Sequence, residues 1–417
     1  MISKFSVLEK YLNYFLLFIF PTQLAFHFWP EFAFVYGVRV DYLSPAIYLT
    51  DVVFLGLFLN WLTHNTKVFL KDIFKNRLVL FLILLFVIGN IVSSDFYPAT
   101  IIKWLRIMEL VCLGYYVKKR RDVFTKAAVS KTFFFSIAAF CLIGIMQVLK
   151  GHTLGGLFYW LGERTFSINT PGISLVNLFG RNHLRAYSTF PHPNSFAGFL
   201  GVALIYILFN HTKINKHVYV LGLSIVFLSF ILTFSLGAFV GGGACLLFYL
   251  IVKKHISNKK VLYYCLIFIF LLSLYLLFFS RSFLESNTNL HQSLQERLEL
   301  NVVAGKIVQS KYLAGTGLNT FFVNEVKHFS FASSVWFLQP VHNIFILVFV
   351  EAGILGLLLL YATLVKFSNK IIDNKDTYPV LLLFFVLGTS FVDHYWFTIY
   401  QNLVLLSFFV GLSLKEK

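Results

Sequence analysis

The sequence predicts an all-α protein, a polytopic membrane helix bundle of about twelve transmembrane helices with a long, partly helical external loop. Three observations predict this class. Of the 417 side chains, 58% are hydrophobic and only 13% are charged, and the mean hydropathy is +0.77, well above that of soluble domains. The apolar residues form runs long enough to cross a bilayer, and Lys and Arg gather between these runs. We expect one membrane domain over residues 1–417.

The candidate membrane helices are apolar runs, since a span needs about 20 mostly apolar residues and fewer when flanking side chains reach the interface. The runs lie near 11–29, 44–62, 78–94, 98–117, 132–149, 194–210, 217–234, 236–252, 261–279, 342–364, 378–392 and 396–412. No small-residue cleavage site follows the first run, so we interpret it as an anchor and not a signal peptide. The least defined boundaries are at 235–237 and 393–395, where almost no loop remains.

The positions of the basic residues test this topology, because cytoplasmic loops collect Lys and Arg. On the twelve-helix interpretation, 23 of the 35 basic residues fall on one side, near 4–10, 67–77, 118–131, 213–216, 253–260, 366–375 and 415–417. Both termini are therefore predicted to be cytoplasmic. The net charge of +17 is then largely explained by the basic residues of the cytoplasmic loops, and it does not indicate nucleic-acid binding. The four cysteines lie inside apolar runs without disulfide or metal spacing, so we interpret them as packing residues.

Two predicted external loops, about 150–193 and 280–341, are long for a compact bundle, and long loops are often functional. They keep cations against the topology bias, which indicates an anionic ligand on the outer face. These cations are Lys150, Arg164, Arg181, Arg185, Arg281, Arg297, Lys306, Lys311 and Lys327. Within the second loop, apolar residues at helical spacing predict an amphipathic helix over 293–308 lying at the membrane interface, with Leu294, Leu298, Val302, Ala304 and Val308 on its apolar face. The glycines of Leu313–Leu318 predict a tight turn after it.

His342 and Asn343 stand at the mouth of the tenth apolar run, where water meets lipid. The N-terminal end of a helix favours a neutral imidazole, which can accept a proton from a hydroxyl group. A simple polar cap is the alternative interpretation. No other histidine stands at metal-ligand spacing, so no metal is predicted. Gly353 and Gly356, one helical turn apart, would let a neighbouring helix approach closely.

The segment from Arg185 to Asn194 leads directly into the sixth run. Its two prolines favour an extended approach, and Asn194 is predicted to cap the following helix. An arginine beside a helix N-terminus is also an anion site, which would suit pyrophosphate. The pattern alone favours a solvated surface pair for Arg297, which has Glu296 and Glu299 close by, and an interfacial anchor for Arg281.

Lys103, Arg106 and Glu109 recur at spacing three on one face of the fourth run. Charges inside a membrane tend to face a cavity or one another. A buried ionic ladder and a lipid-phosphate or proton path both remain open. For Asp393–His394 a turn is preferred over a role in orienting His342. No P-loop, GxGxxG, GxSxG or HExxH pattern occurs in a suitable context, so nucleotide-driven chemistry is not indicated.

These residues together resemble the O-antigen ligase and polymerase superfamily. The resemblance lies in His342-Asn343, then nine residues, then Gly353-x-x-Gly356, in Phe190–Asn194 at the start of the sixth run, and in Arg297 upstream of Leu313–Gly317. Many family members carry Ser-Arg between the seventh and eighth spans, where this chain has Ser235–Ala238. A third cation is missing there, and Arg281 or Arg181 could take its place.

The resemblance implies a metal-independent glycosyltransferase of the bacterial cytoplasmic (inner) membrane, with its active site on the periplasmic face. Such enzymes serve cell-surface polysaccharide assembly, as in lipopolysaccharide. The enzyme would move a glycan from a polyprenyl-pyrophosphate donor, such as undecaprenyl pyrophosphate, to a hydroxyl of a glycan, lipid or protein acceptor, without a cofactor. The implied roles are catalytic for His342, Arg297 and Arg185, substrate-binding for Asn194, Asn343, Arg281 and His192, and structural for Gly353, Gly356, Gly315 and Gly317.

Three alternatives stay open beside the ligase. A repeat-unit polymerase uses the same donor with a second lipid-linked glycan as acceptor, and the motifs do not separate it from a ligase. A protein O-glycosyltransferase is a further variant. A transporter of the lipid-linked glycan is the more remote alternative, because it would call for inverted repeats and discontinuous spans, and no clear pair of these is visible.

Overall fold

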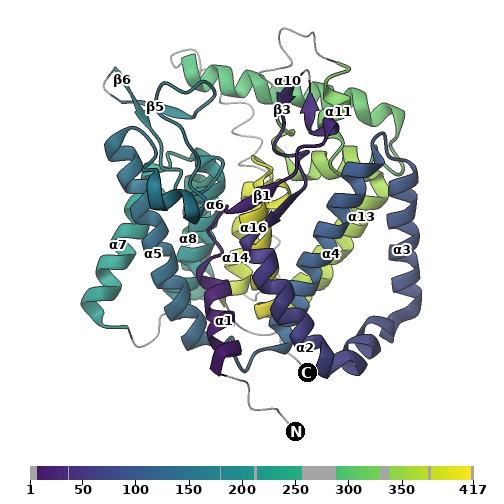
Figure 1. Cartoon of the computed structure of the whole chain (residues 1–417), viewed down its shortest axis with the longest axis horizontal. Helices are drawn as coiled ribbons and strands as arrows, with labels where there is room; N and C mark the ends of the chain where they lie inside the picture. The colour runs from purple at the N-terminus through teal and green to yellow at the C-terminus, as the bar shows by residue number, and fades with distance from the viewer. Residues whose placement is uncertain are drawn as a thin grey trace.

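The chain forms an upright bundle of helices, seen here in a computed structural model that describes residues 7–35, 37–178, 180–210, 214–255, 288–328, 338–373 and 377–414. Helix α1 begins and α16 ends at the same end of the bundle, while α10 and the short β-hairpins lie at the opposite end (Figure 1). The class predicted from the sequence, a helical membrane protein, agrees with this architecture.

Most of the long helices follow the predicted apolar runs, and α10 contains the predicted amphipathic helix. They are α1 (Val7–Phe18), α2 (Leu49–Ile73), α3 (Arg77–Val92), α4 (Tyr97–Lys119), α5 (Lys126–Lys150), α6 (Pro193–Asn210), α7 (Lys216–Leu232), α8 (Leu236–His255), α10 (Thr288–Ser310), α13 (Ile344–Asp373), α14 (Thr377–Ser390) and α16 (Tyr400–Ser413). Short helices α11 (Phe321–Glu325) and α15 (Tyr395–Thr398) and the 3₁₀ turns η1 (Glu31–Ala33), η2 (Phe74–Asn76) and η3 (Gly156–Leu161) join them. The predicted ninth run, 261–279, lies outside the described residues.

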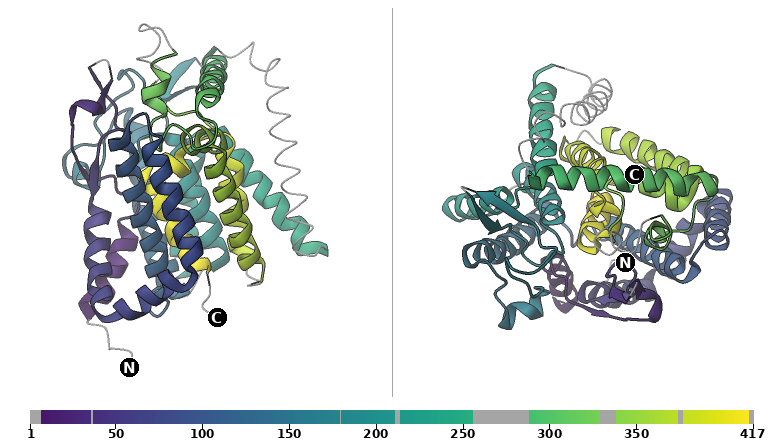
Figure 2. Two further views of the ribbon diagram at one scale, coloured as in Figure 1. Left: turned by 90° about the vertical axis from the view of Figure 1, so that its right-hand side faces the viewer. Right: turned by 90° about the horizontal axis from the view of Figure 1, so that it is seen from above.

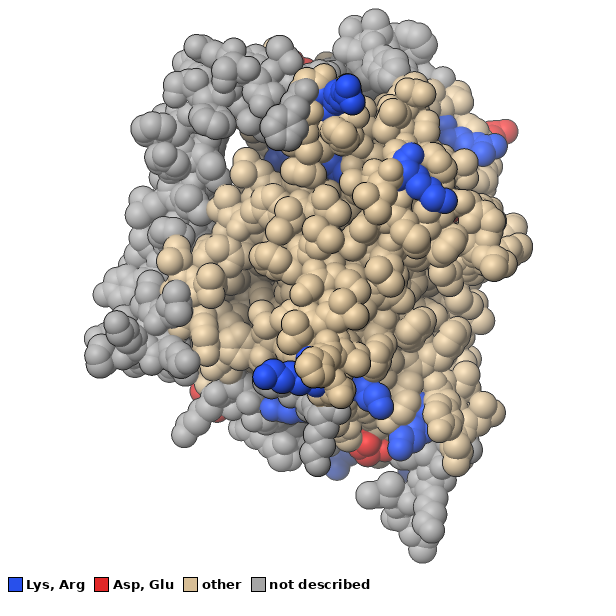
Figure 3. Space-filling view, turned by 90° about the vertical axis from the view of Figure 1, so that its left-hand side faces the viewer, with Lys and Arg blue, Asp and Glu red and all other residues tan. Residues whose placement is uncertain are grey.

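By length and composition, four helical stretches among the described residues could cross a membrane. They are Leu49–Val92, Lys126–Lys150, Pro193–Asn210 and Ile344–Asp373, and several apolar helices are shorter. The predicted count of twelve is therefore not confirmed. Figure 3 shows a broad belt without charged side chains across the described surface of one face, with Lys and Arg above and below it, as a bilayer requires.

Two of the predicted runs have a different form. Helix α1 ends at Phe18, because the coming Pro21 disfavours helical backbone before it. The chain then forms two small antiparallel sheets: β1 (Ala25–His27) pairs with β4 (Ala46–Tyr48), and between them in the chain β2 (Phe34–Val35) and β3 (Val38–Arg39) form a hairpin. The last run is split into α15 and α16 by Ile399, whose backbone is extended. A further hairpin, β5 (Leu175–Leu178) with β6 (Arg181–Leu184), lies in the predicted external loop 150–193.

Helix α10 packs its apolar face on α13 across the end of the bundle (Figure 2). The buried side chains are Leu300, Val303, Ala304 and Ile307, whereas the predicted face members Leu298 and Val302 are exposed. The predicted helix is present, and Ala304 and Val308 of its predicted apolar face do pack against the core, but the assignment of Leu298 and Val302 to that face is wrong. The spacing of 300, 303, 304 and 307 is the more regular helical stripe, and it packs against protein and not only against the interface.

Helix α13 is interrupted at Gly353, and the turn after α10 crosses it there. Gly353 has φ +67° and ψ −172°, a conformation essentially restricted to glycine. The backbone of Thr316 donates to Val350 O (3.0 Å), Gly317 donates to Glu351 O (2.9 Å), and Ile354 donates to Tyr312 O (2.8 Å). The external turn thus satisfies the backbone groups that the break leaves free, as a broken membrane helix requires.

The glycines at this crossing allow two backbones to touch. A Cβ on Gly315 would lie 2.4 Å from the Glu351 carbonyl, and a Cβ on Gly353 would lie 2.2 Å from Leu313 O. At Gly356 a Cβ would meet Ala352, with Phe86 of α3 at 3.3 Å, so this glycine does admit a neighbouring helix. The predicted helix contact at Gly353 is instead a contact with the loop.

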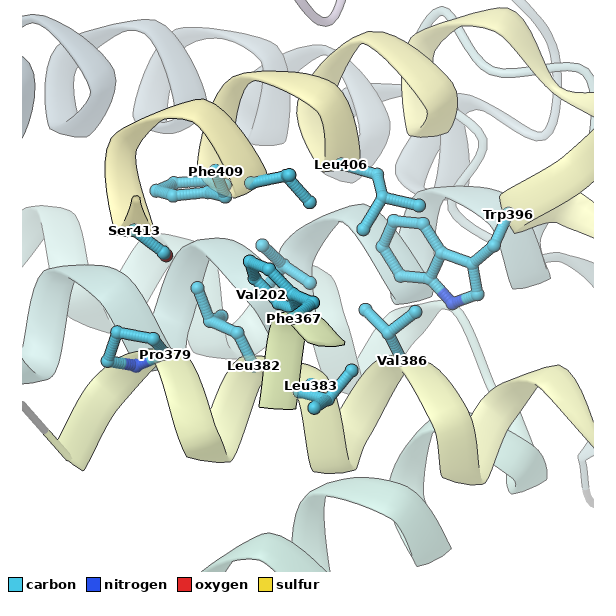
Figure 4. Close-up of a pocket in the computed structure, with 11 residues that line it drawn as sticks. Val202, Phe367, Pro379, Leu382, Leu383, Val386, Trp396, Leu406, Phe409 and Ser413 are labelled. Carbon is cyan, nitrogen blue, oxygen red and sulfur yellow. The ribbon is translucent and has the colours of Figure 1, made fainter. Parts of the chain in front are cut away.

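The middle of the bundle is closely packed and apolar. Figure 4 shows a small cavity there, in which Leu382 and Val386 of α14 face Leu406 and Phe409 of α16. Its volume is about 30 Å³, roughly the volume of one water molecule, and its lining is almost wholly apolar. A polar ligand must therefore bind elsewhere.

Candidate functional site

A larger, polar cavity of about 250 Å³ lies between the loop before α2, helix α4, the segments before α6 and α13, and the α15–α16 region. Its lining includes His192, His342 and the pair Asp393–His394. The sequence predicted His192 and His342 as site residues, and chain segments about 150 residues apart bring them to one cavity. The loop before α2, which the sequence analysis did not single out, supplies Tyr42 and its neighbours.

His342, Asp393 and His394 form a compact cluster. One nitrogen or oxygen of each lies within 4.8 Å of the others. The rings of His342 and His394 meet edge to face with centroids 5.0 Å apart. Nδ1 of His342 is buried, and no hydrogen-bond partner for it is found among the described residues. The sequence pattern favoured a turn for Asp393–His394; the chain does turn there, and the turn also brings both side chains to His342.

Asp393 is held by a chain of side-chain hydrogen bonds. Asn194 Nδ2 donates to Asp393 Oδ2 (2.9 Å), and the Arg185 guanidinium donates to Asn194 Oδ1 (2.7 Å). The other carboxylate oxygen, Oδ1, accepts the backbone N–H of His394 (2.8 Å). Arg185 and Asn194 thus act on the cluster through Asp393, since both bind protein groups here.

The predicted capping role of Asn194 is wrong, and His192 performs it. Helix α6 begins with Pro193, a favoured first residue. His192 Nδ1 accepts the Asn194 backbone N–H (3.1 Å), which places the ring proton on Nε2, facing Ser174 Oγ at 2.7 Å. Burial lowers the pKa of His192 to about 3, with the charge of Arg185 adding to the effect. With both nitrogens engaged, this neutral ring shapes the cavity wall.

Asn343 caps the next helix, α13. Its Oδ1 accepts the backbone N–H groups of Phe345 (2.9 Å) and Ile346 (3.1 Å), and its Nδ2 donates to Phe391 O (3.2 Å). The cap fixes the point at which α13 begins and therefore the position of the preceding His342. All of these contacts are made within the protein, so the geometry supports positioning more directly than substrate binding.

Arg297 projects from α10 to the same place. It donates to Val392 O (3.1 Å), directly before Asp393. Arg185 also donates to Thr233 O (2.6 Å) at the end of α7. Neither arginine is among the residues that line the cavity. Arg281 lies outside the described residues, and Arg181 is exposed on β6. The turn at Ser235–Ala238 supplies no cation in this sequence.

The charge state of the cluster follows from burial. Burial lowers the pKa of His342 well below its usual value, the charge of Arg297 lowers it further, and Asp393 opposes both. Burial likewise lowers the pKa of His394 to about 4. Burial alone would raise the pKa of Asp393, but His394, His342 and Arg297 outweigh it and lower the pKa. Near neutral pH the cluster therefore has two neutral imidazoles beside one carboxylate.

Two histidines and a carboxylate could also hold a metal ion. Here the carboxylate already accepts two hydrogen bonds, His394 Nδ1 lies 2.7 Å from Thr398 Oγ1, and the charge of Arg297 acts on the cluster. These features favour proton transfer over binding of a dication, and a chelator tests the choice directly.

The intramembrane charges of α4 divide into two groups. The Arg106 guanidinium pairs with Asp51 of α2 (2.7 Å) and with Glu109 (2.5 Å), and Tyr400 donates to the same Asp51. The ionic ladder interpretation therefore holds for Arg106 and Glu109. Lys103 faces the cavity instead.

The fold and the cavity define a class: a polytopic helical membrane protein with titratable side chains buried at a polar site, which is a functional arrangement in a bilayer. Residues 221–361 match the family model for O-antigen ligase, a segment that contains Arg297 and His342. This match supports the O-antigen ligase superfamily, and the resemblance seen in the motifs of the chain is confirmed. No curated protein matches the chain significantly. Members of this family are glycosyltransferase-like enzymes, and the family and the apolar helices indicate a bacterial inner-membrane protein.

Proposed function

We propose that the protein transfers a glycan from a polyprenyl-pyrophosphate donor to an acceptor hydroxyl, with His342 as the base. The observation that carries the proposal is that His342, in the segment matching the O-antigen ligase model, lies in a polar cavity beside Asp393, with no hydrogen-bond partner for its Nδ1 among the described residues. The acceptor oxygen attacks the anomeric carbon as the bond to pyrophosphate breaks. The bonding electron pair leaves with pyrophosphate, and the hydroxyl proton passes to His342.

The leaving group needs fixed positive charge and not a proton, because pyrophosphate is a stable anion. The charge of Arg297 lowers the pKa of His342, and that of Arg185 lowers the pKa of His192, which supports placing both charges near the reacting groups. Their hydrogen bonds to Asn194 and Val392 also hold Asp393 in place. We therefore propose two roles for them: a positive field for the leaving group and positioning of the carboxylate that orients His342.

We propose that the end of the bundle with both termini faces the cytoplasm. The loops at that end carry most of the Lys and Arg residues, as the positive-inside rule predicts. The cavity would then open to the periplasmic face, where a lipid-linked glycan is consumed.

The test is an in vitro transfer assay with purified protein, a polyprenyl-pyrophosphate glycan and candidate acceptors, run with and without EDTA. We expect equal rates in both conditions. Loss of transfer in EDTA, restored by added divalent metal, would assign the cluster of His342, Asp393 and His394 to a metal ion instead.

Removing either arginine is expected to lower transfer by about 100-fold or more, because each variant loses charge and also releases a group that orients the cluster. The variants are Arg185→Ala and Arg297→Ala, measured in the transfer assay and by surface-glycan analysis in cells. Lys306→Ala is the matched control, an exposed cation on the same helix as Arg297, and should keep full rate. Wild-type rates in both arginine variants would refute these roles.

A repeat-unit polymerase of the same superfamily is the second candidate, with a lipid-linked glycan as acceptor. A deletion strain separates the two: loss of chain length with attachment retained indicates a polymerase, and loss of attachment indicates a ligase. A transporter predicts instead that purified protein moves lipid-linked glycan between leaflets, and that His342→Ala does so as fast as wild type.

A further inference from the structure

Among the described residues, three cations line the polar cavity, and they differ in how far protein carboxylates already neutralise their charge. They are Lys103, Arg106 and Arg164. Arg106 is bound by the carboxylates of Asp51 and Glu109 and also donates to Ala46 O (2.7 Å). Its donors and its charge are thus taken up by the protein, and it serves to join α2 to α4.

Arg164 lines the cavity but is open to solvent. Its side chain is 43% exposed, and it approaches the 53% exposed Asp41 at 3.7 Å. Such an exposed pair is screened by water and holds a ligand weakly. Arg164 is therefore a poor candidate for the main anion contact.

Lys103 is the cavity cation without a carboxylate at ion-pair distance among the described residues. Its Nζ donates to the backbone oxygen of Phe397 (2.5 Å) and lies 4.8 Å from the centre of that ring. The Glu351 carboxylate attracts the Lys103 ammonium from beyond ion-pair distance. One oxygen of that carboxylate is already bonded within the protein, because it accepts the Phe321 N–H (3.2 Å). An ammonium group has three N–H donors, so two remain for a ligand. A cation held this way within a membrane helix is costly unless it has a partner.

We propose that Lys103 binds the phosphate group of the amphiphilic substrate, in the same cavity as His342. An amphiphilic ligand needs a charged contact for its phosphate and an apolar contact for its lipid. The cavity offers both, because Ile102, Ile399 and Leu403 line it together with the Lys103 ammonium. The phosphate could belong to the pyrophosphate of the donor or to a phosphate on a lipid-linked acceptor. The identity of the substrate rests on the proposed glycan transfer. The existence of an anion site at Lys103 rests only on the residues that line the cavity.

The first measurement is binding of inorganic pyrophosphate and of inorganic phosphate to purified protein, which needs no transfer activity. Wild type is compared with Lys103→Gln, with Lys103→Arg, which keeps the charge, and with Lys306→Gln, an exposed cation removed as a control. We expect at least a tenfold weaker affinity for Lys103→Gln, and near wild-type affinity for the other two. Thermal unfolding in detergent checks that each variant is folded.

The second measurement is steady-state transfer with donor and acceptor varied separately. A raised KM for the donor alone assigns Lys103 to the pyrophosphate, and a raised KM for the acceptor alone assigns it to the acceptor phosphate. If Lys103→Gln bound the anions more weakly than wild type but no protein, wild type included, transferred glycan, the anion site would stand and the proposed glycosyltransferase activity would be rejected. Unchanged anion affinity in a folded Lys103→Gln protein, or no binding of either anion by wild type, would overturn the inference.

Discussion

Replacement of His342 by glutamine is expected to lower glycan transfer by about 100- to 10,000-fold, the usual contribution of a general base. Glutamine keeps polarity and similar length but cannot accept a proton at neutral pH. The neighbouring contacts of Asp393 with Asn194 and His394 do not involve His342, so the fold should persist. The measurement is the single-turnover rate of transfer with saturating acceptor.

The control for this variant is His217→Gln, because His217 is exposed at the start of α7, away from the residues that line the cavity. It should transfer at the wild-type rate. If His342→Gln retained more than a tenth of the wild-type rate, His342 would not be the base, and the cluster would serve orientation alone.

The pH dependence gives an independent check on the same residue. Since burial and the charge of Arg297 lower the pKa of His342 below 6.5, the ring is neutral at pH 7 and stays neutral until the pH falls to that lowered pKa. Transfer should therefore be constant above about pH 6.5 and decline only in acid. In Asp393→Asn the opposing carboxylate charge is gone, so the pKa of His342 falls further and the decline moves to lower pH. A decline that moves upward would contradict the assignment.

Substitution of Gly353 by alanine is expected to have the largest effect on stability, a loss of about 3 kcal/mol or more in the free energy of unfolding. Alanine does not readily adopt φ +67° with ψ −172°, and its Cβ would lie 2.2 Å from Leu313 O. The clash falls on the crossing where Thr316 and Gly317 bond to α13. We expect a lower melting temperature in detergent and reduced membrane yield.

The matched control is Gly89→Ala in α3. That glycine is helical, and a Cβ there meets nothing within 4 Å, so alanine should leave stability unchanged or raise it slightly. If Gly353→Ala had the same melting temperature as wild type, the interruption of α13 at this residue could rearrange at little cost and would not be a fixed part of the fold.

The anchoring of the external turn also depends on residues far from it in sequence. Asn90 of α3 donates to both Ala314 O and Glu351 O (2.9 Å each), and its Oδ1 accepts Trp104 Nε1–H (3.0 Å). Three separate segments therefore meet at one buried amide. The sequence marked the glycines of this region, but the part played by Asn90 became visible only in three dimensions.

Local patterns were predictable because each depends on neighbouring residues along the chain. Runs of apolar residues gave the helices, the proline near α1 accounts for its early end, and glycines marked the turn after α10. Leu298 and Val302 were assigned wrongly to the apolar face of α10 because several stripes fit a short amphipathic segment, and only packing against α13 selects one. Asn194 was assigned as a cap because the sequence does not show that a histidine ring would cap the helix instead.

The sequence by itself determined the membrane class, the resemblance to the O-antigen ligase family, and His342, Arg185 and Arg297 as residues to consider, since these follow from composition, charge and motif spacing. The tertiary structure alone decided that Asp393 and His394 join His342, that Arg185 and Arg297 contact this region without lining the cavity, and that Lys103 lines it. The physical reason is that most of these contacts join segments far apart in the sequence, such as His342 with Asp393 and Lys103 with Phe397, whose meeting depends on how whole helices pack.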